Sequence, residues 1–171
     1  MSSSILPLDS ESPAELPVVR VVRRATFSSC HRLHSPHLSA EENRRVYGKC
    51  NHEGGHGHNY VVRVTLQGPV DPCTGMVINL VHLKAAMDEA IMAPLDHKNV
   101  DKDVAFFAIH PSTVENICIY IWQQLKKHLS LQQKDHLLFE IKVDETENNR
   151  AIYRGGENPF QKNGENALKV E

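Results

Sequence analysis

The chain has 171 residues, of which 40% are hydrophobic and 23% charged, enough for one globular domain with a buried core. Its 19 basic and 21 acidic residues give a formal charge of -2, which excludes the strongly basic surface of a nucleic-acid-binding module. No apolar run approaches the roughly 20 residues of a membrane span, and the start of the chain lacks a secretory pattern. With four scattered cysteines, we expect a cytoplasmic protein with free thiols and with no nucleic-acid or membrane partner.

The two ends of the chain differ in composition from the part between them. Residues 1–17 are rich in Ser, Pro and Glu and predict a flexible N-terminal arm. Residues 157–171 are polar and irregular and predict a flexible C-terminal tail. We therefore expect one folded domain over residues 18–156.

The first half of this domain predicts two strands with a short helix between them. Residues 18–33 are rich in Val, Thr and Phe, which favours a strand. In 39–48, Ser39 and Glu42 have the spacing of a capping box, and a glycine can end the helix. Residues 58–68 alternate apolar and polar side chains, the period of a half-buried strand.

The second half predicts two longer helices and a hairpin. Apolar side chains recur at helical spacing in residues 80–92, and again in 112–129, where Ser112 and Glu115 form a second possible capping box. After a polar stretch, two strands turn near residues 147–149 and form the hairpin; their ranges are 137–146 and 149–156. The main elements follow the order ββααββ, which predicts an α+β domain with helices on one face of a four-stranded antiparallel sheet. Its exposed strand edges favour an oligomer.

The stretch GKCNHEGGHGHNY contains the strongest chemical signal. His56 and His58 are one residue apart where a strand begins, so both imidazoles point to one side and can bind one Zn²⁺ ion. A polar strand end is the alternative explanation. Cys50 could be a fourth ligand that closes a structural site, or it could remain free beside a catalytic one. Spacing alone leaves five candidates for the third ligand: His31, His34, His37, His52 and His97.

Two further places contain groups suited to proton transfer or ligand binding. Asp96 precedes His97 directly, and a carboxylate beside an imidazole can orient the ring and stabilise its protonated form. Glu145 follows a predicted strand and could accept paired N–H bonds from a guanidine-like ligand edge. Exposed surface charge explains each of these residues equally well from the sequence alone.

Taken together, these motifs resemble the 6-pyruvoyl-tetrahydropterin synthase family. The shared stretches follow the family's order over roughly residues 20–156 and read FSSCHRL, LSAEEN, GKCNHEGGHGHNY, DPCTGMVINLVHLK, PLDHKNVD, STVENICIYIW and VDETENN. The resemblance implies a tunnelling-type fold (T-fold), in which three chains close a β-barrel and two trimers form a hexamer. It also implies zinc-dependent conversion of 7,8-dihydroneopterin triphosphate to 6-pyruvoyl-tetrahydropterin and triphosphate, in tetrahydrobiopterin synthesis.

The resemblance also assigns roles to individual residues. It implies that three histidines bind zinc, and these are His31, His56 and His58. It further implies that Cys50 is the general base, and it assigns the remaining roles to Asp96 and His97 (relay to the thiol), Glu145 (pterin amino edge), and Thr113 and Glu115 (pterin pocket). Glu115 could instead serve only as a helix cap.

Two other functions remain open from the sequence. A sister enzyme, 6-carboxy-tetrahydropterin synthase, uses the same substrate and a similar zinc triad, but with a shorter spacing between its cysteine and H-G-H. Five residues separate Cys50 from His56 here, which favours the pyruvoyl enzyme. The other alternative is a zinc-binding module without turnover, in which Cys50 would complete a four-ligand site.

Overall fold

A computed structural model gives the structure of the chain and describes residues 15–156. The expected arm and tail therefore lie outside the described residues, apart from residues 15–17, which precede the first strand. No helix among the described residues is long and apolar enough to cross a membrane.

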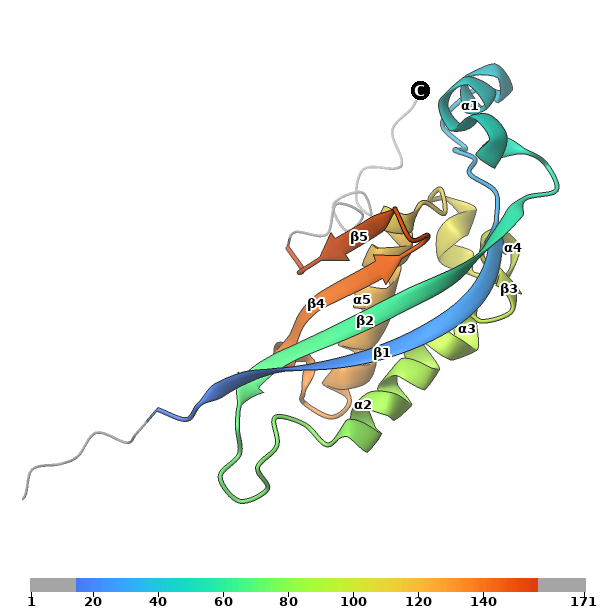
Figure 1. Cartoon of the computed structure of the whole chain (residues 1–171). Helices are drawn as coiled ribbons and strands as arrows, with labels where there is room; N and C mark the ends of the chain where they lie inside the picture. Colours follow the sequence, from blue (N-terminus) through green and yellow to red (C-terminus); the bar gives the residue numbers. More distant parts are fainter. Residues whose placement is uncertain (1–14, 157–171) are drawn as a thin grey trace, which may run out of the picture.

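One sheet carries the fold (Figure 1). β1 (Val18–His31) and β2 (His56–Pro69) pair antiparallel along their whole length, with Val18 opposite Pro69 and His31 opposite His56. β4 (Leu138–Asp144) extends the sheet beside β2, and β5 (Arg150–Tyr153) closes the predicted hairpin. The α+β class and the order of these four strands are thus confirmed.

The prediction of a four-stranded, wholly antiparallel sheet is wrong, because a fifth strand is present and runs parallel to its neighbour. Within residues 15–156 the sheet has five strands in the order β3-β1-β2-β4-β5. β3 (Lys98–Asn99) runs parallel to β1, where Lys98 pairs with Ser29 and Asn99 with Cys30. A two-residue strand is too short to show an alternating pattern in the sequence.

Two of the predicted helices form as expected, with local differences. α1 (Ala40–Tyr47) begins at the predicted Ser39–Glu42 capping box and ends at Gly48. The predicted helix 80–92 is one continuous rod that changes its winding, and its parts are α2 (Leu80–Met87), the π-helical η2 (Asp88–Met92) and α3 (Ala93–Leu95). Because Pro94 has no backbone N–H, it cannot donate an α-helical hydrogen bond, which is compatible with the change of winding near it.

The start of α5 (Val114–Ser130) corrects a second prediction. Thr113 caps this helix, because its side chain accepts from the backbone N–H of Asn116. Ser112, the predicted cap, is fully buried one residue earlier, so the Ser112–Glu115 capping box does not form. The remaining short elements are η1 (Gly48–Asn51), α4 (Val100–Asp103), η3 (Ala105–Ala108) and η4 (Asp135–Leu137).

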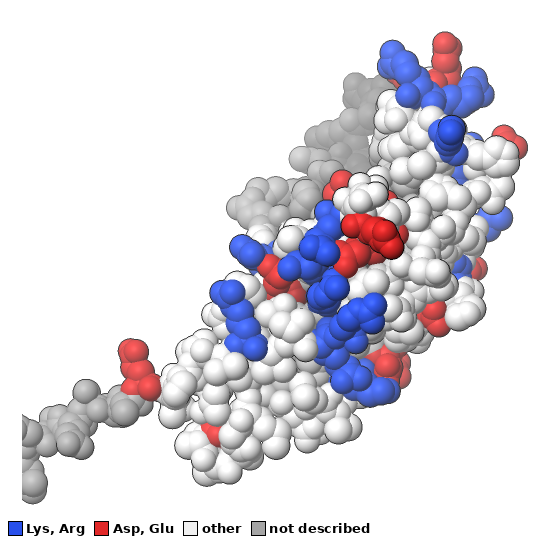
Figure 2. Space-filling view, viewed as in Figure 1, with Lys and Arg blue, Asp and Glu red and all other residues white. Residues whose placement is uncertain are grey.

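The domain has two layers, with α2 and α5 behind one face of the sheet (Figure 1). The alternation predicted for β2 is confirmed, since Tyr60, Val62, Val64 and Leu66 are fully buried on the helix side. The other face of the sheet is open, and Lys and Arg side chains gather over it with acidic side chains between them (Figure 2). His56, His58 and Tyr60 are two residues apart along β2, so their side chains lie on the same face of the sheet. Both histidines therefore lie on the helix side, at the end of the sheet.

Candidate metal centre and active site

Three histidines converge where β1 and β2 end. The potential ligand atoms of His31, His56 and His58 all lie within 4.8 Å of one another. His31 is buried, whereas the other two are half-buried and accessible from the solvent side. The pairing register brings them together, because it places His31 directly opposite His56.

The spacing and the chemistry of this cluster fit a zinc ion. The Nε2 atoms of His31 and His56 are 3.1 Å apart, close to the ~3.3 Å expected for two nitrogens at Zn–N distances of ~2.0–2.1 Å in a tetrahedron. The Nδ1 atom of His31 lies 2.8 Å from the carbonyl oxygen of Ser112 and donates to it. This bond fixes the tautomer and leaves Nε2 of His31 as the metal-binding atom.

Burial favours the neutral, metal-binding form of two of these histidines, His31 and His58. The pKa of His31 is lowered to about 4, mainly by burial and to a smaller extent by the neighbouring His56 and His58, against the opposing effect of the Ser112 carbonyl. Burial also lowers the pKa of His58, although the charge of Glu145 opposes this. Neutral imidazoles have the free lone pair that a cation requires.

Glu145 lies beside the same cluster, directly after the end of β4. Its Oε1 atom is 3.8 Å from Nε2 of His31 and 3.9 Å from Nε2 of His58. The carboxylate thus faces the centre, at distances longer than hydrogen bonds. This position leaves it available to accept hydrogen bonds from a bound ligand.

A hollow of ≈ 490 Å³ brings the three predicted pterin-binding residues together. Its walls include Thr113 and Glu115 from the start of α5, and Glu145 from the turn after β4. Leu33 contributes an apolar side chain to the same hollow. A space of this size with a few convergent polar groups is typical of small-molecule sites.

The side chains of Asp96 and His97 contact each other, which their neighbouring positions in the sequence could not establish. Their side chains meet at 2.8 Å, between Oδ2 of Asp96 and Nδ1 of His97. The backbone N–H of Ser28 donates to Asp96, and this bond, followed by His97, lowers the pKa of the carboxyl. The His97 ring is 83% exposed and lines a hollow of ≈ 410 Å³ that also includes His58.

Cys50 lies in η1 and is half-buried. Its backbone carbonyl accepts from Leu33 N–H at 2.9 Å, which attaches η1 to the chain after β1. The convergent group of possible metal ligands in the described chain does not include this thiol. Within one chain, among residues 15–156, no hydrogen bond joins the Cys50 thiol to Asp96 or His97.

The sequence of the chain matches proteins of one known family. A sequence model of the family described as 6-pyruvoyl tetrahydropterin synthase matches residues 20–156. The chain belongs to this family. It is 54% identical over 136 residues to 6-pyruvoyl tetrahydrobiopterin synthase of Homo sapiens, covering 80% of this chain and 91% of the human one. The Drosophila melanogaster protein of the same name is 52% identical over 151 residues, 88% of this chain and 86% of its own length.

Solved structures agree with this assignment. The structure of Caenorhabditis elegans 6-pyruvoyl tetrahydropterin synthase superposes with a TM-score of 0.78 at 44% identity, covering 82% of this chain and 98% of that chain. The Plasmodium falciparum 6-pyruvoyl tetrahydropterin synthase superposes with a TM-score of 0.57 at 22% identity, covering 81% and 98%. The second comparison supports the fold alone.

Two residues of the centre did not emerge from the sequence. Ser112 supplies the carbonyl that orients His31, although its position suggested only a helix cap. Tyr60 follows His58 by two residues, and its ring centroid is 5.5 Å from that of His58. The alternation of β2 was the available signal for Tyr60, because it places residues 56, 58 and 60 on one side.

Proposed function

We propose that this protein is a lyase that converts 7,8-dihydroneopterin triphosphate to 6-pyruvoyl-tetrahydropterin with release of triphosphate, in tetrahydrobiopterin synthesis. One observation carries the proposal: three imidazoles converge beside Glu145 in a chain about half identical to synthases of this name. In this proposal residues 18–156 form the synthase domain.

The residues of the centre divide into metal ligands and pterin ligands. His31, His56 and His58 would hold Zn²⁺, which as a Lewis acid supplies acidification of the substrate's side-chain protons. Glu145 accepts the paired N–H groups of the pterin's amino edge, a planar donor pair that matches a carboxylate. Thr113 and Glu115 line the same hollow and hold the rest of the ring.

The proton transfers are assigned to Cys50, Asp96 and His97. The Cys50 thiolate removes a proton from the substrate side chain, which sets up elimination of triphosphate with cleavage of its C–O bond to the side chain. Repeated enol–keto shifts then move hydrogen from side chain to ring. The ionised Asp96 stabilises protonated His97, and a protonated imidazole near a thiol favours the thiolate. Since no hydrogen bond or ion pair joins Cys50 to His97 within one described chain, the exposed His97 is available to the thiol of a neighbouring subunit.

A cationic hollow around η1 is suited to the triphosphate. The lining of this hollow of ≈ 710 Å³ has three cationic side chains, two histidines and one carboxylate: Arg32, Arg44, Lys49, His34, His52 and Glu53. Among the described residues Arg44 and Lys49 form no ion pair. Unpaired cations can bind phosphate oxygens strongly, so Lys49→Ala would raise the KM for the triphosphate substrate more than it changes kcat.

The proposed assembly is a hexamer, formed as a dimer of trimers in which three sheets close a β-barrel. Among residues 15–156, β3 and β5 are the edge strands of the sheet and pair on one side only, which supports this proposal because such edges favour pairing with another chain. The four cysteines are unpaired in the structure, which agrees with the reducing cytoplasm that we propose as the protein's location.

Turnover tests the proposed function directly. Purified protein is incubated with 7,8-dihydroneopterin triphosphate, with and without a zinc chelator, and the products are separated. We expect triphosphate and 6-pyruvoyl-tetrahydropterin, with activity lost on chelation and restored by Zn²⁺. Release of acetaldehyde would instead identify the 6-carboxy-tetrahydropterin synthase activity. Retained zinc with no turnover at all would identify a binding module.

A further inference from the structure

Two buried polar atoms in the described chain lack a hydrogen-bond partner, and both belong to residues beside His31. They are the hydroxyls of Tyr60 and Ser112. The backbone carbonyl of Ser112 accepts from His31, and the Tyr60 ring centroid is 6.3 Å from that of His31. A buried hydroxyl without a partner is unfavourable, and a functional role at a site is one explanation for such a group.

The Tyr60 ring is fixed in place by its neighbours. It is fully buried and stacks on Phe27, with ring centroids 4.9 Å apart and planes 14° from parallel. His58 packs against it at 5.5 Å in an edge-on arrangement. The ring therefore packs directly against the histidine cluster. Its hydroxyl is the one polar atom of the side chain, and it has no hydrogen-bond partner.

Glu145 borders the same histidine as Tyr60, because its Oε1 atom lies 3.9 Å from Nε2 of His58, whose ring packs on Tyr60. Burial raises the pKa of Tyr60, and the nearby negative charge of Glu145 raises it further. The carboxylate is also held near the cluster, with Oε1 3.8 Å from Nε2 of His31. Its two oxygens have lone pairs for a donor from the protein as well as for two donors from a ligand.

We propose that Tyr60 is a positioning residue that orients the Glu145 carboxylate for pterin binding. When a pterin's amino edge engages Glu145, the Tyr60 hydroxyl donates to the same carboxylate from behind and holds its plane against the paired N–H groups. A hydrogen bond to an ionised acceptor is stronger than a neutral one, which suits it to this task. The inference rests on the proposed function, because it takes Glu145 as the pterin-binding carboxylate.

The experiment removes the hydroxyl alone. Tyr60→Phe keeps the stacked ring, so we expect wild-type zinc content and an undiminished Tm. Neopterin, titrated by its fluorescence, should bind about 10-fold more weakly to the variant, as expected for one hydrogen bond to a charged group. KM for the triphosphate substrate should rise with it, with a smaller change in kcat. The matched control is Tyr120→Phe, a buried tyrosine of α5 that packs on Phe106 and Phe107 away from this cluster.

A double-mutant cycle with Glu145→Gln identifies the partner. If Tyr60 acts through Glu145, Tyr60→Phe should weaken neopterin binding far less in the Glu145→Gln background than in the wild type. Additive losses, wild-type affinity of Tyr60→Phe, or loss of zinc from this variant would each overturn the inference, as would absence of neopterin binding to the wild type. The proposed function fails separately, through absence of wild-type turnover.

Discussion

The Nδ1 atom of His31 lies 2.8 Å from the carbonyl oxygen of Ser112, so the end of β1 is bonded to the residue that precedes the cap of α5. The bond connects the two layers of the domain at the point where the histidines converge. It also explains why Thr113 caps the helix, since Ser112 is held in the buried layer by His31. The metal centre and the start of α5 therefore form one structural unit.

The first prediction concerns the histidine cluster. His58→Ala removes one of three converging nitrogens and should reduce zinc affinity at least 10-fold, with loss of turnover. Zinc per chain after dialysis, measured by atomic absorption, gives the result. His52→Ala is the matched control, because His52 is exposed and its Nδ1 only accepts from the Gly54 N–H. Equal zinc loss in both variants would contradict the assignment of ligands.

The second prediction separates a base from a ligand. Cys50→Ala should retain a full equivalent of zinc and lose at least 100-fold in kcat, because the thiol transfers protons without holding the metal. Zinc content and turnover are measured on the same preparation. A loss of zinc from Cys50→Ala would show that the thiol is a fourth ligand, as in a closed structural site.

The third prediction tests whether the relay crosses subunits. Cys50→Ala and His97→Ala should each be nearly inactive alone. After mixing, dissociation and reassembly, about a quarter of the sites should combine an intact Cys50 with an intact His97 from a neighbouring chain, if the chains assort randomly. Recovered turnover is compared with wild type taken through the same procedure. A mixture that remains inactive would place the relay within one chain.

Local features of the fold could be predicted from the sequence because they depend on residues close together in the chain. The Ser39–Glu42 capping box and the alternation of β2 are of this kind. The shared face of His56 and His58 follows from the same alternation. Such features need only the period of a helix or strand and a few side-chain bonds.

The third metal ligand could not be chosen from the residues alone, because long-range pairing determines it. His31 reaches the cluster through the register of a 14-residue strand pair, whereas five histidines were compatible with the spacing. β3 is missed for a similar reason. It forms where His97 turns the chain with a φ of 59° and donates its N–H to the Ser28 carbonyl, a contact between residues far apart in sequence.

The fourth prediction concerns the glycine before β2. Gly55 has a φ of +69°, and a Cβ there would lie 2.8 Å from the carbonyl oxygen of His31. Gly55→Ala should therefore cost about 2 kcal/mol or more in the free energy of unfolding, from backbone strain and the clash together. Because the clash moves His31, zinc affinity should fall as well. Urea unfolding with chelator present, followed by zinc titration, measures the two effects.

Gly75→Ala is a closely matched control. Gly75 has the same φ of +69°, but a Cβ there would meet no atom within 4 Å. Gly75→Ala should therefore lower the free energy of unfolding only through backbone strain, by about 1 kcal/mol, and should leave zinc affinity unchanged. If the two variants behave alike, the contact with His31 does not contribute.

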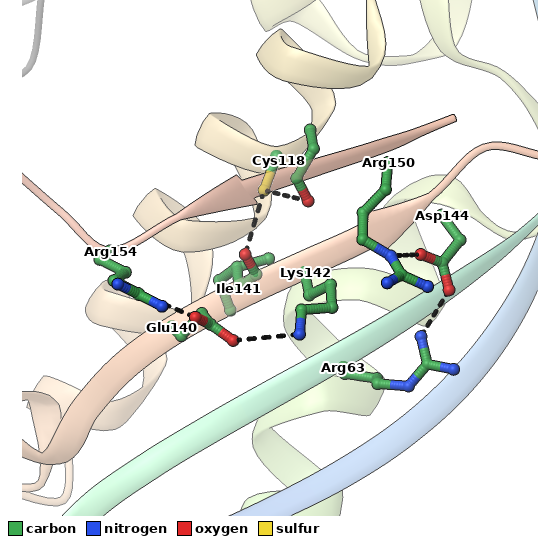
Figure 3. Close-up of polar contacts among 9 residues, drawn as sticks. Arg63, Cys118, Glu140, Ile141, Lys142, Asp144, Arg150 and Arg154 are labelled. Carbon is green, nitrogen blue, oxygen red and sulfur yellow. Dashed lines mark hydrogen bonds and ion pairs between the residues drawn. The ribbon is translucent and has the colours of Figure 1, made fainter. Parts of the chain in front are cut away.

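The fifth prediction concerns the open face of the sheet, where two carboxylates each lie between two cations (Figure 3). Glu140 contacts Lys142 and Arg154, and Asp144 contacts Arg63 and Arg150. The hydrogen bond from Arg150, followed by that from Arg63, holds the pKa of Asp144 below its usual range against the opposing effect of burial. These ion pairs anchor the strand end from which Glu145 enters the site.

A depressed carboxyl pKa stabilises the fold above the unfolded pKa of ~3.9, and this contribution is lost as the pH falls through the lower folded value. Asp144→Asn should therefore lower the free energy of unfolding at pH 7 by about 1 kcal/mol, a modest figure because Arg150 is half-exposed and screened by solvent. The difference from wild type should narrow below pH 4. Urea unfolding at pH 7 and near pH 3 measures it, with Asp88→Asn as the control for an exposed pair with Lys84. A difference that stays constant with pH would show that Asp144 acts through packing or hydrogen bonding, independent of its charge.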